Sequence, residues 1–144
     1  MNIEYHQDKF SIFTDRYRLN IDFIHDYLCN QSYWAQGRTR EVVEKSIRNS
    51  LCFGVFEGEK QVGFARIVSD YITFAWLCDV FIAKSHRGQG LGKWLVKSVI
   101  SHLEVESVKY ILLATSDAHE LYRKYGDFGA LQAIEKWMVR YKEK

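Results

Sequence analysis

Hydrophobic and polar positions along the chain fall into blocks that predict strands and helices. Runs of β-branched and aromatic residues predict strands, and apolar residues spaced three and four apart predict helices. The predicted helices follow Asn20, follow Thr39, run from Leu91 to around residues 103–106, and surround Tyr122. The predicted strands are residues 10–14, 51–56, 61–68, 73–82 and 110–114, with one or two edge strands within 132–141.

Local signals mark where several of these elements begin and turn. Asn20 and Thr39 each carry a side-chain oxygen that can cap the first turn of a helix. The short polar stretch 58–60 separates two predicted strands, so we expect these strands to pair as a hairpin. On the inner side of the second helix we expect Val42, Val43 and Ile47.

The resulting order, β-α-α-β-β-β-α-β-α-β, indicates an α+β fold with a mixed, mostly antiparallel central sheet flanked by helices. A helix separates strand 73–82 from strand 110–114, which favours parallel pairing of these two strands. Neither a linker nor a repeat interrupts the pattern. Residues 1–144 are therefore expected to form a single domain.

Composition narrows the class of protein without identifying it. Apolar residues make up 47% of the chain, which is typical of a globular protein. A net charge of +2 argues against a chain built to coat nucleic acid or an acidic membrane. The N-terminus does not resemble a signal peptide, and no apolar run is long enough to span a bilayer. We therefore expect a soluble, cytoplasmic monomer or homodimer.

Cysteine and histidine spacing gives no sign of a metal site. Cys29, Cys52 and Cys78 lie far apart, so they are expected to be buried thiols in a reducing compartment. His86 and His102 are expected at the surface.

Three glycines in five residues stand where the helix starting at Leu91 begins. The segment reads Arg87-Gly88-Gln89-Gly90-Leu91-Gly92-Lys93, and unpaired amides at a helix N-terminus readily bind phosphate. The spacing matches neither a Walker A loop nor a dinucleotide fingerprint. What remains is a phosphate loop of another kind, or a glycine-rich turn without a ligand.

Two motifs together carry a resemblance to a known family. Arg87, Gly90 and Gly92 match the pattern Arg/Gln-x-x-Gly-x-Gly/Ala, and Ala118 and Tyr122 match Ala-x-x-x-Tyr on the helix after the next strand. On these motifs the chain resembles the GNAT superfamily of N-acetyltransferases. The resemblance covers about the C-terminal two-thirds of the chain, and the N-terminal third agrees only in its order of elements.

The resemblance implies a fold and a co-substrate. In the family, two parallel strands splay apart and open a slot that holds acetyl-CoA, with no metal. The pantetheine arm would pair with the main chain of Val80, Phe81 and Ile82. Thr115 stands where the family often has an asparagine that bonds the pantetheine. The pyrophosphate would be bound by Arg87, Gly88, Gln89, Gly90, Leu91, Gly92 and Lys93.

Tyr122 and Asp79 are the candidate catalytic residues. The resemblance places Tyr122 near the cofactor sulfur, where it would protonate the leaving thiolate; the alternative is a tyrosine of the core. Asp79 is an ionisable residue in an apolar strand, so it is a candidate base for the acceptor amine. Alternatively, Asp79 caps a loop or pairs with Arg66 or Arg87.

The acceptor side is less defined by the sequence. In this superfamily the loop between the first two helices builds the acceptor pocket, and here that loop carries Tyr33 and Trp34. These aromatics either line the acceptor site or pack beneath the sheet as a plug. Asp127 separates Gly126 from Phe128, where the family usually has Gly-Phe, and is expected to shift the loop behind Tyr122.

These observations support one functional interpretation and leave one alternative. We interpret the chain as an acetyl-CoA-dependent N-acetyltransferase, with direct attack of a small-molecule or peptide amine on the thioester. The alternative is a non-catalytic acyl-CoA-binding or regulatory module of the same fold.

Overall fold

Six strands form one sheet whose order in space is their order in the chain, β1-β2-β3-β4-β5-β6. The computed structural model describes residues 2–142. All neighbouring strands pair antiparallel except β5 and β6, which are parallel, so the predicted mixed sheet is confirmed. The strands are β1 Glu4–Gln7, β2 Phe10–Phe13, β3 Leu51–Glu57, β4 Lys60–Ser69, β5 Phe74–Ile82 and β6 Tyr110–Leu112.

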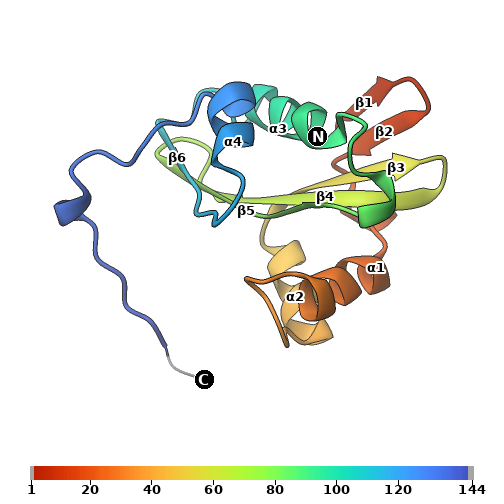
Figure 1. Cartoon of the computed structure of the whole chain (residues 1–144), viewed down its shortest axis with the longest axis horizontal. Coiled ribbons are helices and arrows are strands. Elements are labelled where there is room, and N and C mark those ends of the chain that lie inside the picture. Colours follow the sequence, from red (N-terminus) through yellow and green to blue (C-terminus); the bar gives the residue numbers. More distant parts are fainter. Residues whose placement is uncertain (1, 143–144) are drawn as a thin grey trace.

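Helices cover both faces of the sheet (Figure 1). On one face lie α1 (Ile21–Asp26), which continues into a π-helical turn over Tyr27–Gln31, and α2 (Arg40–Arg48). On the other face lie α3 (Leu91–Ser101) and α4 (His119–Gly126). Short 3-10 turns cover Arg16–Arg18, Lys84–His86 and Ile134–Lys136.

Both predicted helix caps are confirmed. The Asn20 side chain accepts a hydrogen bond from the Phe23 amide, and the Thr39 hydroxyl accepts one from the Val42 amide. These bonds satisfy amide groups that lack partners inside the helix, which is why each helix begins at these residues. The prediction for the buried side of α2 is only partly right. Val43 and Ile47 are buried, but Val42 is 52% exposed.

Two hydrophobic cores result from this layering. The core beneath α3 and α4 contains Phe53, Leu95 and Val99, and the core beneath α1 and α2 contains Phe64 and Phe81. Because side chains alternate between the two faces of a strand, one sheet supplies both cores. Contrary to expectation, His102 belongs to the interior and is only 1% exposed.

A bulge in β5 interrupts its pairing with β4 at Asp79 and Val80. Phe64 faces Phe81 and Arg66 faces Cys78, so Ala65 alone faces the two residues Asp79 and Val80. Asp79 has a left-handed φ of 53°. Such bulges bend a strand and re-aim its side chains. Since β5 and β6 pair only over Phe74–Trp76, the two parallel strands separate beyond Trp76, as expected.

The chain ends differ from the sequence-based prediction. The predicted edge strands within 132–141 are wrong, because this segment contains a 3-10 turn and no strand. Instead, the segment leaves the body of the molecule on the side of β6 (Figure 1). At the other end, the short strand β1 was missed, since Glu4–Gln7 is largely polar and exposed.

In the loop behind Tyr122, Phe128 packs against the Tyr122 ring. Asp127 takes the left-handed conformation that ends α4, with φ of 59°, and the Phe128 amide bonds to the Tyr122 carbonyl. The Phe128 ring packs edge-on against Tyr122 at 5.9 Å between centroids. Asp127 thus supplies the helix C-cap, a position that Asp tolerates better than most residues.

Candidate functional site

Two adjoining cavities lie where β5 and β6 separate. One, of about 600 Å³, is lined by the Gly88–Gly92 turn and is called the glycine-loop cavity. The other, of about 440 Å³, is lined by Asp79 and the residues after β6 and is called the Asp79 cavity. The two share part of their walls, namely Tyr33, Trp34, Val80, Asp117, Ala118 and Tyr122.

The glycine-loop cavity fits a phosphate group. Gly88 and Gly90 have φ of 82° and 80°, and a Cβ at either would have open space, so conformation rather than room favours glycine there. The first helical bond of α3 runs from the Trp94 amide to the Gly90 carbonyl. The three amides before Trp94 therefore lack partners within the helix and face the end where its dipole is positive.

Cations and the edge of β5 complete this cavity. Lys84, Arg87 and Lys93 line it, as do Val80, Phe81 and Ile82 of β5. Among the residues expected to bind the cofactor, Gln89 is exposed and does not line either cavity.

Arg87 is fixed by contacts that the sequence did not reveal. Its Nε donates to the Ile82 carbonyl at 3.0 Å, and one terminal nitrogen donates to the Tyr27 hydroxyl at 2.6 Å. The Tyr27 ring in turn stacks on Phe81 with centroids 3.8 Å apart. These contacts connect the glycine loop to the π-helical turn after α1 and to the end of β5. No local signal could indicate Tyr27, because it lies 60 residues before Arg87.

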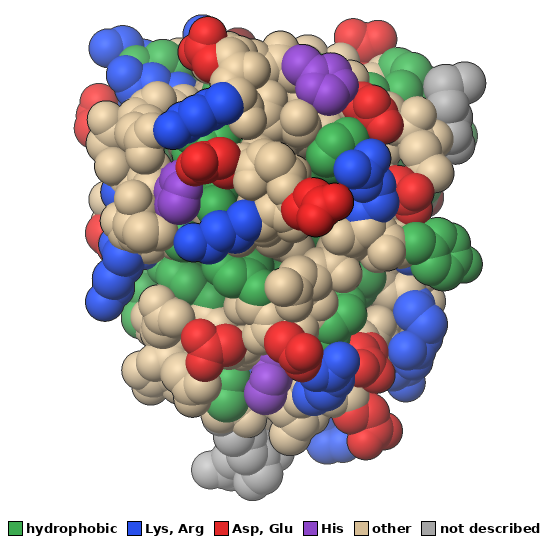
Figure 2. All heavy atoms as spheres, turned by 90° about the vertical axis from the view of Figure 1, so that its right-hand side faces the viewer, with side chains coloured by type: hydrophobic (Ala, Val, Ile, Leu, Met, Phe, Trp, Pro, Cys, Tyr) green, Lys and Arg blue, Asp and Glu red, His purple; other side chains and the backbone are tan. Residues whose placement is uncertain are grey.

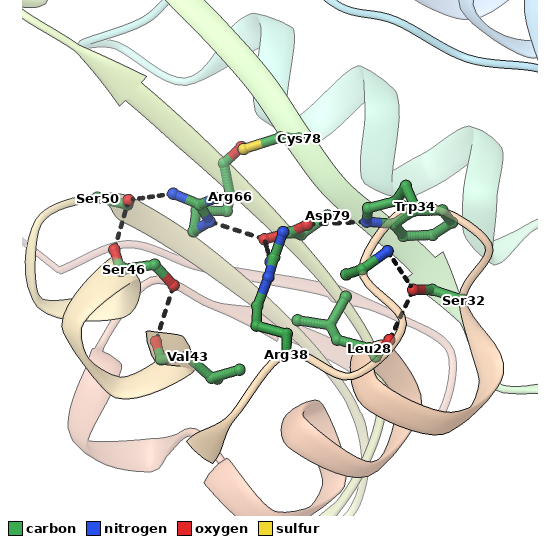
Figure 3. A network of polar contacts seen from close by, with 11 residues as sticks. Leu28, Ser32, Trp34, Arg38, Val43, Ser46, Ser50, Arg66, Cys78 and Asp79 are labelled. Carbon is green, nitrogen blue, oxygen red and sulfur yellow. Dashed lines mark hydrogen bonds and ion pairs between the residues drawn. The ribbon is translucent and has the colours of Figure 1, made fainter. Parts of the chain in front are cut away.

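Asp79 is the centre of a buried polar cluster (Figure 3). Its Oδ1 accepts from the Trp34 indole N–H at 2.8 Å, and its Oδ2 accepts from Arg38 at 2.8 Å and from Arg66 Nε at 2.9 Å. The Asp79 side chain is 1% exposed. The ion pair between Asp79 and Arg66, one of the alternatives considered from the sequence, is present. Arg38 also pairs with Asp79, whereas Arg87 lines the glycine-loop cavity.

The cluster carries more positive than negative charge. Two guanidinium groups meet one carboxylate, and Arg66 also donates to the Ser50 hydroxyl at 3.0 Å. A buried carboxylate requires such partners, because removing its water is costly. Arg38 and Arg66 both line the Asp79 cavity, so the cluster sets the electrostatics of that wall.

Tyr33 and Trp34 form part of the cavity walls. They are 50% and 39% exposed, so they are not a plug beneath the sheet. The Tyr33 hydroxyl accepts a hydrogen bond from the Ser116 amide at 2.8 Å, and hydrogen bonding at Ser116 lowers the pKa of Tyr33. This bond joins the loop that carries Tyr33 to the loop before α4, and both residues line the Asp79 cavity.

Tyr122 lies where the two cavities meet. It is 8% exposed, and burial raises its pKa to about 12. The hydroxyl has no hydrogen-bond partner among residues 2–142. The phenol therefore stays protonated at neutral pH and is available as a hydrogen-bond donor to a group in the cavities.

Thr115 does not line the glycine-loop cavity. It lines the Asp79 cavity, and its hydroxyl accepts from the Ala118 amide at 3.1 Å. Cys78 lines the same cavity, and burial raises its pKa to about 11.

Other kinds of site find no support in the described part of the chain. Within residues 2–142 no group of three or more His, Cys, Asp or Glu side chains could hold a metal ion. In the same range no helix is both long and apolar enough to cross a membrane. Figure 2 shows positive and negative side chains interspersed around a band of hydrophobic ones, rather than a patch of one sign.

Comparison with known proteins gives a consistent result. The model of the "Acetyltransferase (GNAT) family" matches residues 21–127. A Gibberella zeae protein named as an acetyltransferase is 26% identical over 152 residues, covering 88% of this chain and 86% of that protein. An uncharacterized N-acetyltransferase of Gracilaria tenuistipitata is 33% identical over 111 residues, covering 72% of this chain and 60% of that protein.

Solved structures resemble this chain over most of its length. A GNAT-family protein from Xanthomonas campestris is 40% identical, with a TM-score of 0.90 over 95% of this chain and 96% of that one. A GNAT acetyltransferase from Elizabethkingia anophelis, solved with acetyl-CoA bound, is 18% identical with a TM-score of 0.61. That match covers 83% of this chain and 76% of that one, and it shows a shared fold.

Proposed function

This chain belongs to the GNAT family of acetyltransferases, and we propose that it transfers the acetyl group of acetyl-CoA directly to a primary amine. One observation carries the proposal: Tyr122 stands between a cavity suited to phosphate and a second cavity that can hold an acceptor. Acetyl-CoA would supply the activated thioester. The whole of residues 1–144 would act as one catalytic domain.

The glycine-loop cavity is proposed to hold the co-substrate. The amides at the start of α3, together with Lys93 and Arg87, would bind the pyrophosphate. Beyond Trp76, β5 has no β6 partner, so main-chain groups of Val80 and the Ile82 amide would be available to pair with the pantetheine amides. The Ile82 carbonyl already accepts from Arg87. The same strand would present an amide to the thioester oxygen as negative charge develops there.

Tyr122 is proposed to stabilise the leaving sulfur. A phenol with a pKa of about 12 is a weaker acid than a thiol with a pKa of about 8.5. Tyr122 would therefore act mainly by donating a hydrogen bond to the departing thiolate, and tyrosinate would not accumulate. In the net reaction the neutral amine loses one proton and the sulfur gains one, so the charges balance without a lasting change in Tyr122. An acceptor that arrives as an ammonium ion first releases a further proton to solvent.

The contacts of Asp79 favour a positioning role over that of a base. Its two oxygens already accept three hydrogen bonds, so taking a proton from the amine would require weakening an ion pair. We propose that Asp79 holds Trp34 and Arg38 in place as walls of the acceptor site. Water would then remove the proton of the attacking amine.

A covalent acetyl-cysteine intermediate is not part of the proposal. Cys78 does line the Asp79 cavity, but a pKa of about 11 keeps its thiol protonated at neutral pH. Because the thiolate is the reactive form of cysteine, Cys78 would be a poor nucleophile. Direct attack by the amine therefore fits the site better than transfer in two steps.

The test is release of free CoA thiol from acetyl-CoA with a panel of amines that includes amino acids, polyamines and peptide N-termini. Turnover with at least one amine, absent without it, would support the proposal. Tight acetyl-CoA binding without turnover by any member of a broad panel would instead favour the non-catalytic module.

A further inference from the structure

The wall of the Asp79 cavity carries two positive groups whose charge is only partly balanced. Arg38, from the loop before α2, and Arg66 of β4 both reach the Asp79 carboxylate (Figure 3). Their side chains are 22% and 13% exposed, whereas that of Asp79 is 1% exposed. One guanidinium group is enough to neutralise one carboxylate, so the second leaves an excess positive charge at this wall.

Several donors of these arginines remain unused. Arg38 donates through one terminal nitrogen, and its Nε and second terminal nitrogen have no hydrogen-bond partner among residues 2–142. Arg66 uses Nε and one terminal nitrogen, so its other terminal nitrogen is unused in the same range. The one fully buried side-chain nitrogen or oxygen without a partner in that range is His102 Nε2. The unused arginine nitrogens are therefore accessible, and both arginines line the Asp79 cavity.

The negative charge of the same cavity lies on a different wall. Asp117 is exposed, and its carboxylate has no hydrogen-bond or ion-pair partner within the described part of the chain. Asp117 and Tyr122 line both cavities, whereas the two arginines line only the Asp79 cavity. Burial first, and then the charges of Tyr33 and Asp117, raise the pKa of Tyr122, so the Asp117 carboxylate lies near the phenol. The cavity thus separates an excess positive charge at the arginines from a negative charge near Tyr122.

We propose that the acceptor is a small amine that also carries a carboxylate, a free amino acid in the simplest case. Its carboxylate would be bound by the unused donors of Arg38 and Arg66, and its amine would lie at the wall formed by Asp117 and Tyr122. Arginine binds carboxylates well, because both partners are charged and its donors are arranged as a fork. The inference rests on the proposed function, since it names the acceptor of that same reaction.

Charge balance explains why such an acceptor is preferred over other amines. Its carboxylate would bring the polar cluster around Asp79 to two positive and two negative groups, and a partly buried guanidinium is costly without a partner. A polyamine would instead bring further positive charge to this wall. In a peptide, the carboxylate next to the N-terminal amine is an amide, so the charge-assisted bonds would be lost. The cavity volume of about 440 Å³ suits a small ligand.

The same arrangement orients the acceptor for transfer. Asp117 would attract the ammonium form, which then loses one proton to solvent. The neutral amine forms the N–C bond to the acetyl carbonyl carbon as the C–S bond breaks, and its second proton goes to the sulfur. The products are an N-acetylated acid and free CoA thiol.

The first experiment compares amino acids with matched derivatives by release of CoA thiol. Each amino acid is assayed beside its amide and beside the amine that remains when the carboxylate is removed. For the best acceptor, kcat/KM should fall at least about tenfold in both derivatives, because each loses charge-assisted hydrogen bonds. Equal rates with an amino acid and its amide, or a best acceptor without a carboxylate, would overturn the inference and leave the proposed transfer intact.

Arg38→Gln tests the assigned donor. It removes one guanidinium group and leaves Asp79 paired with Arg66. The KM for the amino acid should rise about tenfold or more, with little change for its amide. Arg40→Gln is the matched control, because Arg40 is exposed and lines neither cavity. If Arg38→Gln kept the full preference for the amino acid, the assignment would be wrong.

Asp117→Asn tests the other end of the cavity. Since the amino acid and its amide both carry the amine, KM should rise for the two alike. A loss confined to the amino acid would contradict the proposed orientation.

Calorimetry distinguishes failure of this inference from failure of the proposed function. Wild-type protein saturated with CoA is titrated with each amino acid and with its amide. Tighter binding of an amino acid than of its amide, without turnover of any amine, would retain the carboxylate site and remove the transferase. Without turnover, equal affinities or no measurable binding of any amino acid would remove the carboxylate site as well.

Discussion

Trp34 and Asp79 are 45 residues apart in the chain, yet the indole N–H of one donates to the carboxylate of the other at 2.8 Å. This bond connects the loop after α1 to the bulge of β5. It places the Trp34 ring in the wall of the Asp79 cavity and depends on a carboxylate that also accepts from two arginines. A substitution that removes the Asp79 carboxylate should therefore release the Trp34 ring and break both arginine ion pairs at once.

Asp79→Asn should destabilise the fold, because it removes the negative charge that two partly buried guanidinium groups contact. Breaking a buried ion pair in this way costs about 3 kcal/mol. Urea unfolding measures this loss. Asp22→Asn is the control, since Asp22 pairs with Arg40 at an exposed position and should lose less than about 1 kcal/mol.

The pH–rate profile of Asp79→Asn separates the two roles of this residue. A positioning role predicts a lower rate with the acid limb of the profile preserved. If Asp79 were the base for the amine, the acid limb would change with the substitution, and the proposal for Asp79 would have to be abandoned.

Tyr122→Phe should lower kcat at least tenfold while the affinity for acetyl-CoA stays nearly constant. The ring and its contact with Phe128 are retained, so the melting temperature should move little. Loss of a positioned proton or hydrogen-bond donor typically costs about 10² to 10⁴ in rate. Tyr17→Phe, at a position 88% exposed, is the control. Full turnover by Tyr122→Phe would show that Tyr122 only packs.

The pH dependence gives Tyr122 a second test. Its pKa is raised to about 12, so the phenol is protonated at every pH below about 11 and cannot cause a decline in rate there. Wild type and Tyr122→Phe should therefore have profiles of the same shape up to pH 10. A decline near pH 9 that vanishes in the variant would contradict this assignment.

Gly90→Asp should weaken CoA binding at least tenfold, because it places an anion where the phosphate is proposed to bind. The left-handed φ of 80° also adds strain of about 1 kcal/mol. Gly58→Asp is a matched control: Gly58 has φ of 61° and open space around a Cβ, but lies in the β3–β4 turn. Calorimetry should show weak binding only for Gly90→Asp; equal affinities for both variants would remove the phosphate assignment.

His102 should make stability depend on pH. It is buried at the end of α3, and its Nε2 has no hydrogen-bond partner among the described residues. Burial lowers its pKa in the folded state. As pH falls below about 6.5, the unfolded chain takes up a proton that the folded chain resists. Stability should decrease from there until the folded-state pKa is passed, and then level off.

Urea unfolding at pH 7.5 and 5.5 measures this effect. His102→Gln should lose part of the pH dependence, whereas His119→Gln, at an exposed position on α4, should keep it. An unchanged pH dependence in His102→Gln would assign the effect to other groups.

Features set by near neighbours in the chain could be predicted from the sequence. The caps at Asn20 and Thr39, the glycine turn before Leu91 and the strand periods each depend on a few consecutive residues. The parallel pairing of β5 and β6 followed from the helix between them. The roles of Tyr122 and the glycine loop came from a resemblance, and remain predictions.

What only the tertiary structure decided is which distant side chains meet. The left-handed bulge at Asp79 turns its carboxylate toward Trp34, Arg38 and Arg66, which come from a loop and from another strand. Packing of one layer on another creates such contacts, and no periodicity along the chain encodes them. For the same reason the strand pattern within residues 132–141 gave a wrong prediction, because a strand forms only where an edge is available to pair with it, and local sequence cannot supply that edge.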